Sequence, residues 1–105
     1  MKVLVTGATS MIGRVTVQEL LRRGHEVSVL QRGDSDLAVT VHRGDIRDSK
    51  VVAEAIQGCD VVIHAAAKVG LIGRYREFYD INVEGTKNIL NAAAEAGCRG
   101  VVYVS

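Results

Sequence analysis

The sequence has 105 residues, 13 of them basic and 12 acidic, and carries a formal charge of +1. This length suffices for one hydrophobic core and is too short for two. A near-neutral charge with the two signs interspersed excludes a partner bound mainly by electrostatics, such as nucleic acid or an anionic membrane. A small molecule is therefore the expected ligand.

The cysteines and the N-terminus bear on the compartment. Cys59 and Cys98 are two thiols in a chain whose N-terminus runs straight into an apolar, strand-like stretch without a signal peptide. We therefore expect reduced thiols and a cytoplasmic location. No apolar run approaches the roughly 20 residues that cross a bilayer, and the His and Cys residues lack metal-ligand spacing. Neither a membrane span nor a metal site is expected.

Short β-branched runs alternate along the chain with longer segments of helical period, which is the pattern of βαβ units and a parallel sheet. Strands are predicted over residues 2–6, 26–30, 39–42, 60–65 and 100–105. Helices are predicted over residues 12–23, 49–58 and 75–96. Gly24, Gly58 and Gly97 would end these helices, and Ser49 is the candidate N-cap of the second.

Two of the predicted strands, "DVVIHA" and "GVVYVS", are apolar on both faces, which is typical of interior strands covered by helices on either side. The fold class is therefore α/β, a doubly wound parallel sheet of five strands. Right-handed crossovers predict the Rossmann-like strand order 3-2-1-4-5. A ligand would bind at the carboxyl ends of strands one and four, where the winding reverses.

The stretch "VTGATSMIG", residues 5–13, lies where the first strand ends and the first helix begins. Gly7 suits a tight turn, and Gly13 suits close packing of the helix on the sheet. The positive end of the helix would face a pyrophosphate above the turn, with Thr9, Ser10, Met11 and Ile12 beside it. Ser10 occupies the position usually held by a middle glycine, and its hydroxyl could donate to a phosphate oxygen. The alternative is a plain turn that uses glycine for geometry alone.

"TGATSMIG" resembles the T-G-x-x-G-x-x-G loop of extended short-chain dehydrogenases/reductases, the NAD-dependent epimerase/dehydratase superfamily. "GDIRD" (44–48), "DVVIHAAA" (60–67) and "NVEGTKNIL" (82–90) resemble later segments of the same family, in the same order. Residues 64–90 are similar to the branch that contains 3β-hydroxysteroid dehydrogenase/isomerases and sterol-4α-carboxylate 3-dehydrogenases. The resemblance covers essentially the whole chain.

The resemblance implies roles for several residues. Asp45 and Ile46 would flank the adenine, and the small side chains of Ala65, Ala66 and Ala67 would let the cofactor lie close to the sheet. Asn82 would help to orient the catalytic lysine through water, or would simply hydrogen-bond to a neighbouring strand. His64 is expected to have a structural role beside the cofactor.

Cofactor choice is expected at the end of the second strand, where an acid accepts hydrogen bonds from the NAD ribose and a base pairs with the NADP 2′-phosphate. Gln31 stands at the position of the acid, and Arg32 follows it. Arg32, helped by Arg14, would favour NADP over NAD. Two alternatives stay open: Arg32 as a solvated loop charge, and a different use of the nearby Asp34 and Asp36.

Hydride transfer in this family needs a Ser or Thr, a tyrosine and a lysine, the last two as Y-x-x-x-K. The sequence contains no Y-x-x-x-K, because Tyr79 and not lysine follows Tyr75 by four residues. Ser105 matches only the first of the paired hydroxyls. The expectation is a dinucleotide-binding domain over residues 1–105, a truncated part of an oxidoreductase, without a catalytic residue or substrate domain.

A different class of function is a non-catalytic nucleotide-binding or self-associating fragment. With no strand beyond it, the segment "GVVYVS" would be an apolar sheet edge without proline. Such an edge predicts a homodimer through paired final strands.

Overall fold

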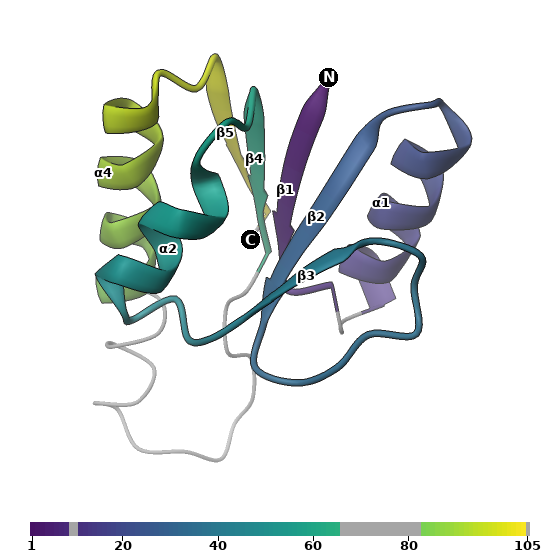
Figure 1. The fold of residues 1–105 in the computed structure, drawn as a ribbon, viewed down its shortest axis with the longest axis horizontal. Coiled ribbons are helices and arrows are strands. Elements are labelled where there is room, and N and C mark those ends of the chain that lie inside the picture. Colours follow the sequence, from purple (N-terminus) through teal and green to yellow (C-terminus); the bar gives the residue numbers. More distant parts are fainter. Residues whose placement is uncertain (9–10, 66–82, 105) are drawn as a thin grey trace.

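The computed structural model describes residues 1–8, 11–65 and 83–104. Its strands are β1 (Lys2–Thr6), β2 (Glu26–Gln31), β3 (Thr40–Arg43), β4 (Val61–His64) and β5 (Gly100–Tyr103), and its helices are α1 (Met11–Arg22), α2 (Ser49–Ile56) and α4 (Gly85–Ala96). Within the described residues the strands form one parallel sheet in the order β3-β2-β1-β4-β5 (Figure 1). The predicted doubly wound fold and the strand order 3-2-1-4-5 are confirmed.

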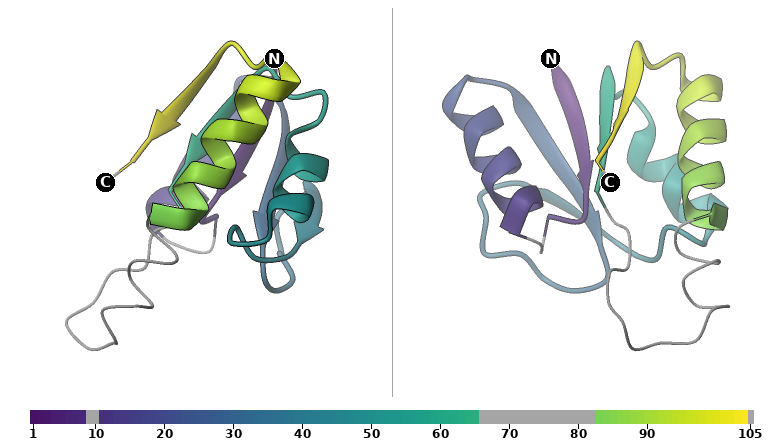
Figure 2. Two further views of the ribbon diagram at one scale, coloured as in Figure 1. Left: turned by 90° about the vertical axis from the view of Figure 1, so that its left-hand side faces the viewer. Right: turned by 180° about the vertical axis from the view of Figure 1, so that it is seen from behind.

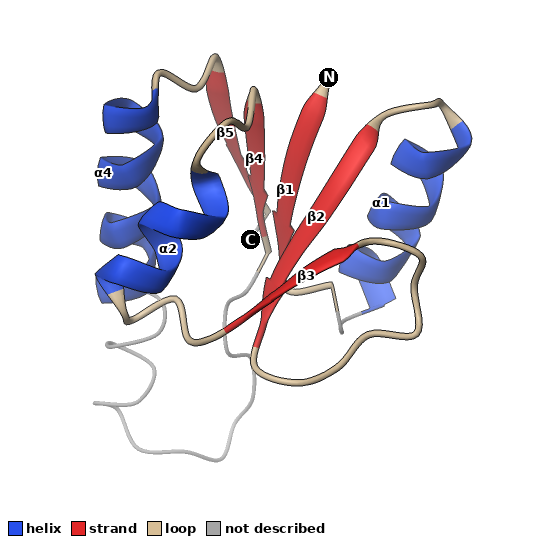
Figure 3. Ribbon diagram, in the orientation of Figure 1, coloured by secondary structure: helices blue, strands red, loops and turns tan. Residues whose placement is uncertain are grey.

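The sheet forms a central layer between helices (Figure 3). Helix α1 covers one face, and α2 and α4 cover the other (Figure 2). Successive side chains of β1 point to opposite faces. Val3 and Val5 therefore join the core under α1, with Val17, whereas Leu4 joins the core under α2 and α4, with Ile89. Burial on both faces explains why the central strands are almost continuously apolar.

The ends of α2 differ slightly from the prediction. The N-cap is Asp48 and not Ser49, since the Asp48 carboxylate accepts a hydrogen bond of 3.0 Å from the backbone N–H of Lys50. An aspartate is an equally good cap, and Ser49 becomes the first helical residue. At the other end Gly58 has a φ of +80°, which suits the C′ position predicted for it.

The third predicted helix falls partly outside the described residues. Its described part, α4, begins at Gly85 and ends at Ala96, followed by Gly97 with a φ of +72°. The Gly97 position is as predicted, whereas residues 75–82 of that helix lie outside the described part of the chain. The start of α4 packs closely on the loop after β3, because a Cβ added at Gly85 would lie 2.4 Å from Ile46 Cδ1.

Strand β5 is an edge of the described sheet, as the predicted strand order and the alternative of an exposed final strand require, whereas the prediction of an interior strand covered on both faces is wrong for it. Val102 and Tyr103 are 52% and 50% exposed. The physical reason is visible in Figure 2: α1 lies over the β1–β2 side of its face, and no described helix covers β5 there. β5 therefore presents apolar side chains and one unpaired edge within the described structure.

Candidate functional site

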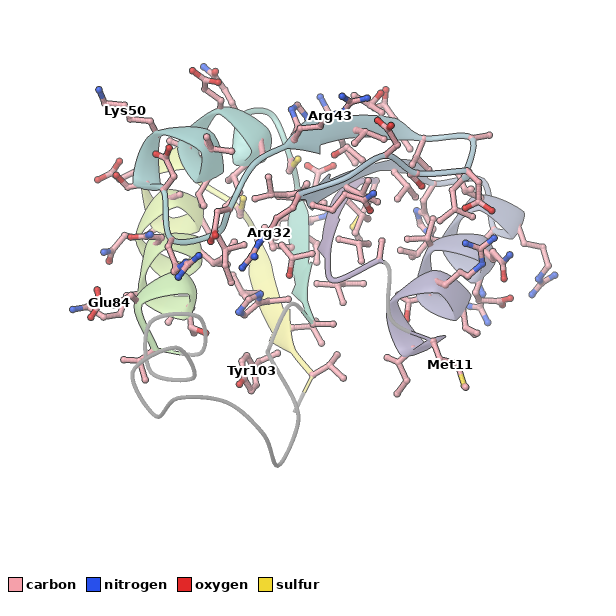
Figure 4. All side chains as sticks on the ribbon, turned by 90° about the horizontal axis from the view of Figure 1, so that it is seen from below. Met11, Arg32, Arg43, Lys50, Glu84 and Tyr103 are labelled. Atoms are coloured by element: carbon pink, nitrogen blue, oxygen red, sulfur yellow. The ribbon has the colours of Figure 1, made fainter. Side chains whose placement is uncertain are left out.

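The carboxyl ends of all the strands meet at one edge of the sheet, at the bottom of Figure 1. The winding reverses between β1 and β4, which pair directly with Thr6 opposite His64. Open α/β sheets bind ligands in the crevice at such a reversal. Figure 4 looks onto this edge and shows Arg32 near the middle of the view.

The glycines after β1 bring a turn and a helix start into direct contact. Gly7 has a φ of +76°. A Cβ added at Gly13 would lie 2.0 Å from the carbonyl oxygen of Gly7 and 2.9 Å from the Cα of Ala8, both backbone atoms that cannot move aside cheaply. No side chain therefore fits between the turn and α1, and the positive end of the α1 dipole lies directly beside the end of β1. This close approach agrees with the packing role predicted for Gly13, and it brings the helix start to the place where the pyrophosphate was predicted to bind.

The first residues of α1 present their side chains to solvent. Met11 is 83% exposed and Ile12 is 57% exposed, at the start of the helix. Thr9 and Ser10, which were predicted to lie beside the pyrophosphate, fall outside the described residues.

A buried histidine joins three elements at the carboxyl ends of β1 and β4. The Nδ1 atom of His64 lies 2.7 Å from Thr6 Oγ1 on β1, and its Nε2 atom lies 3.0 Å from Thr86 Oγ1 on α4. The backbone N–H of Ala65 donates to the same Thr6 oxygen at 3.1 Å. These contacts tie the ends of β1 and β4 to α4 and support the structural role predicted for His64.

Burial lowers the pKa of His64, because the charged imidazolium loses its hydration. Its side chain is only 1% exposed, and the ring of Tyr103 lies at a centroid distance of 5.5 Å. A neutral ring that can both donate and accept a hydrogen bond matches the two threonine partners. Protonation would remove the acceptor and add a buried charge.

The side chain of Gln31 holds the loop that follows β2. Its Nε2 atom donates to the carbonyl oxygens of Gly33 and Asp34 at 2.9 and 2.7 Å, and the residue is buried. Gln31 was predicted at the position where the NAD-type acid would bind the ribose. Here its amide protons bond to the loop, so the residue shapes the segment that carries Arg32.

The arginines at this edge have carboxylate partners. Arg14 donates two hydrogen bonds of 2.7 Å to the two carboxylate oxygens of Asp36, and Arg43 pairs with Asp34. Arg32 Nη2 lies 3.3 Å from Asp45 Oδ2. Asp34 and Asp36, for which a use other than cofactor recognition was left open, are thus both paired with arginines other than Arg32.

Asp45 and Ile46 connect the loop after β3 to the rest of the edge. The hydrogen-bonded Arg47 guanidinium holds the pKa of the Asp45 carboxyl below its usual value, against the opposing effect of partial burial. Ile46 is buried against α4, and its carbonyl oxygen accepts a hydrogen bond of 2.9 Å from Asn88 Nδ2. The segment predicted to flank the adenine is therefore anchored on both sides.

The structure brings most of the predicted site residues to the same edge of the sheet. Those in the described part of the chain are Gly7, Met11, Ile12, Gly13, Gln31, Arg32, Asp45, Ile46 and Ala65. Ala66, Ala67 and Asn82, like Thr9 and Ser10, lie outside it. Arg47 and Thr86 were not predicted as site residues, although both fall inside the motifs "GDIRD" and "NVEGTKNIL".

Within the described residues, no group of three or more His, Cys, Asp or Glu side chains comes together in a way that would hold a metal ion. No helix among them combines the length and the apolar character that a membrane span requires. Neither thiol forms a disulfide, and Cys59 is buried while Cys98 is partly buried.

The fold agrees with the comparison to known proteins. Residues 3–105 match the model of the NAD dependent epimerase/dehydratase family. The chain belongs to this family. Among curated members, it is 39% identical over 115 residues to "3-beta-hydroxysteroid dehydrogenase" of Mycolicibacterium neoaurum, with 99% of the chain and 31% of that protein covered. It is also 39% identical over 112 residues to "Sterol demethylase protein B" of Methylococcus capsulatus, with 100% of the chain and 34% of that protein covered.

Solved structures of this epimerase/dehydratase type show the same fold. A short-chain dehydrogenase/reductase superfamily protein from Agrobacterium tumefaciens with bound NAD superposes with a TM-score of 0.91 at 31% identity, covering 100% of this chain and 32% of that one. UDP-glucose 4-epimerase of Thermus thermophilus in complex with NAD superposes with a TM-score of 0.86 at 31% identity, covering 96% and 36%. The chain thus spans about a third of the length of these relatives.

Proposed function

We propose that this chain binds NADP or NAD at the carboxyl edge of its sheet, as the dinucleotide-binding domain of an oxidoreductase of the short-chain dehydrogenase/reductase type. The observation that carries the proposal is the close contact between Gly7 and Gly13, which leaves no room for a Cβ and places the start of α1, with its positive dipole end, directly beside the end of β1 where a pyrophosphate would bind. The NAD-bound members of the family that share the fold support it. Titration of the chain with NADP and with NAD tests it.

Each part of the cofactor has proposed partners in the chain. The pyrophosphate would lie over the loop formed by Gly7, Thr9, Ser10, Met11, Ile12 and Gly13. Gln31 and Arg32 would lie beside the adenosine ribose, and Asp45 and Ile46 beside the adenine. Ala65, Ala66, Ala67 and Asn82 would lie toward the nicotinamide half.

We further propose that NADP is slightly favoured over NAD. Arg32 follows β2 at the point where this family reads the ribose, and its side chain is 64% exposed. A guanidinium there suits a 2′-phosphate, to which it can donate charge-assisted hydrogen bonds. The amide of Gln31 bonds to the loop, and it brings no negative charge that would repel that phosphate.

Arg32→Gln is expected to weaken NADP binding by about tenfold and to leave NAD binding within about twofold, since one exposed charge-assisted contact is lost. Calorimetric titration with the two cofactors measures this. Arg99→Gln is the matched control, because Arg99 precedes β5 at the opposite edge of the sheet and the charge change is the same. Equal loss of NADP and NAD affinity in Arg32→Gln would contradict the proposed role.

The activity of a whole protein containing this domain is also a proposal. The relatives named above support a steroid dehydrogenase or a sugar-nucleotide epimerase or dehydratase. Since the 105 residues contain no Y-x-x-x-K, we propose that they supply cofactor binding and that they perform no hydride transfer by themselves. The proposed location is the cytoplasm.

A second candidate function is self-association through β5, as a non-catalytic nucleotide-binding or self-associating module. The specific observation is that, among the described residues, the outer edge of β5 has no strand beside it and Val102 and Tyr103 are half exposed. Exposed apolar edge strands pair readily with another copy, and a two-fold axis would pair two β5 strands into a continuous sheet. The two candidates are compatible, because β5 carries none of the proposed cofactor partners.

Val102→Lys is expected to abolish a dimer that the unaltered chain forms at high concentration, because two lysines would face each other across the axis. Sedimentation velocity over a concentration series measures the change. Val15→Lys is the control, because it adds the same charge on α1 at a residue that is similarly exposed, at 59%. A chain that stays monomeric throughout the series would contradict self-association.

A further inference from the structure

One carboxylate is shared by two arginines across the gap between the loops that follow β2 and β3. Arg32 comes directly after β2, and Asp45 comes two residues after β3. Arg32 Nη2 lies 3.3 Å from Asp45 Oδ2, and Arg47 Nη2 lies 2.6 Å from the same oxygen.

The two arginines hold Asp45 unequally. Arg47 reaches it through its backbone N–H, its Nε and its Nη2, in four hydrogen bonds of 2.6 to 3.1 Å. Arg32 makes one longer contact from a side chain that is 64% exposed, whereas Asp45 is only 26% exposed. If Arg32 moved away, the carboxylate would still be neutralised by Arg47. Arg32 is thus the partner that can be exchanged at low cost.

The neighbouring arginines are less available. Arg14 is held by both oxygens of Asp36 at 2.7 Å, and Arg43 is paired with Asp34. Each of those pairs has one positive and one negative charge, whereas the cluster of Arg32, Asp45 and Arg47 has two positive charges and one negative. Among these four described arginines, Arg32 is therefore the one least firmly held by a carboxylate, and an incoming anion would meet the least competition there.

We propose that Asp45 determines cofactor selectivity by competing with the 2′-phosphate of the cofactor for Arg32. When the phosphate binds, Arg32 exchanges the Asp45 carboxylate for the phosphate, and Asp45 stays with Arg47. The NADP preference then reflects the difference in free energy between two ion pairs of Arg32, one with the 2′-phosphate and one with Asp45. This preference is smaller than it would be if Arg32 had no carboxylate partner in the free protein. This inference rests on the proposed dinucleotide function and concerns its selectivity.

Asp45→Asn tests the competition, because the amide keeps an oxygen that can accept from the Arg47 backbone N–H and loses the charge that holds Arg32. The probes are adenosine 2′,5′-bisphosphate and adenosine 5′-monophosphate, titrated by NMR, with NADP and NAD alongside. These nucleotides differ only in the 2′-phosphate, and they do not need the pyrophosphate loop. Expressing the result as a ratio of affinities removes any effect of Asp45 on the adenine itself.

The expected result is an increase of about twofold to fivefold in the affinity ratio of the bisphosphate to the monophosphate, as for loss of one exposed ion pair. The increase should vanish in the double variant Asp45→Asn with Arg32→Gln, and should shrink at high salt. Glu54→Gln, which removes one exposed negative charge from α2, is the control and should leave the ratio unchanged.

An unchanged ratio in Asp45→Asn, or the same increase without Arg32, would overturn the competition while leaving dinucleotide binding intact, provided NAD and the monophosphate still bind. Failure of the unaltered chain to bind any of the four nucleotides would overturn the proposed function and this inference with it. The two failures are therefore distinguishable in one set of titrations.

Discussion

Gly13→Ala is expected to lower the free energy of unfolding by about 3 kcal/mol, at the upper end of what overpacking costs. The added methyl would lie 2.0 Å from the Gly7 carbonyl oxygen and 2.7 Å from its carbon. Both atoms belong to the backbone of a turn at the end of a buried strand, so the steric clash can be removed only if α1 moves away from the sheet. Urea unfolding followed by circular dichroism measures the loss.

Gly33→Ala is the matched control for Gly13→Ala. Gly33 lies in the loop after β2 at the same edge of the sheet, and an added Cβ there would meet no atom within 4 Å. The free energy of unfolding of the Gly33→Ala variant should change by no more than about 0.5 kcal/mol. If Gly13→Ala were as stable as Gly33→Ala, the close contact between the turn and α1 would be wrong. The loop proposed to bind the pyrophosphate would then lose its structural basis.

His64→Ala is expected to lower the free energy of unfolding by about 3 kcal/mol, from the cavity left by a fully buried ring and from the loss of its two hydrogen-bonded contacts. Thr6 on β1 and Thr86 on α4 both lose a partner. Chemical unfolding at pH 7.5 measures the effect. A change below about 1 kcal/mol would contradict the role of His64 in joining the strands to α4.

The pH dependence gives a separate test of the same histidine. Its pKa is depressed in the folded chain below the ordinary value of 6.5, so between the two values the unfolded chain binds the extra proton. The contribution of the neutral His64 ring to stability is therefore fully present above about pH 6.5. It is lost as the pH falls below that value, by at most about 1.4 kcal/mol per pH unit. His64→Ala should show a flatter profile between pH 7.5 and 5.5. Parallel profiles for the two proteins would contradict a neutral, buried ring.

The strand order and the glycine positions could be predicted from the sequence because they depend on local patterns. The alternation of β-branched runs with helical segments predicts the parallel sheet, and a glycine after each helix marks its end. The position of Gly13 in the motif predicts close helix packing, since that role requires a residue without Cβ. Even the error at Ser49 is small, because Asp48 beside it has the same capping chemistry.

The side-chain contacts that tune the site could not be predicted in this way. The sharing of Asp45 by Arg32 and Arg47 depends on how far apart two loops lie after strands that are neighbours in space, and residue spacing does not give that distance. The same reason applies to two other contacts. The Gln31 amide bonds to its own loop, and His64 meets Thr86, 22 residues further along the chain, only because the fold brings these groups together. The edge position of β5 was among the predictions, but its uncovered face follows from where α1 lies on the sheet, which the apolar pattern of "GVVYVS" does not show.

The most direct test of the central claim is calorimetric titration of this chain with NADP and, separately, with NAD. Binding of both, with NADP the tighter, is the predicted result, because the pyrophosphate is proposed to lie beside the start of α1 and Arg32 is proposed to pair with the 2′-phosphate. Absence of binding by either cofactor at millimolar concentration would contradict the claim and would reduce the glycine loop to a turn between a strand and a helix.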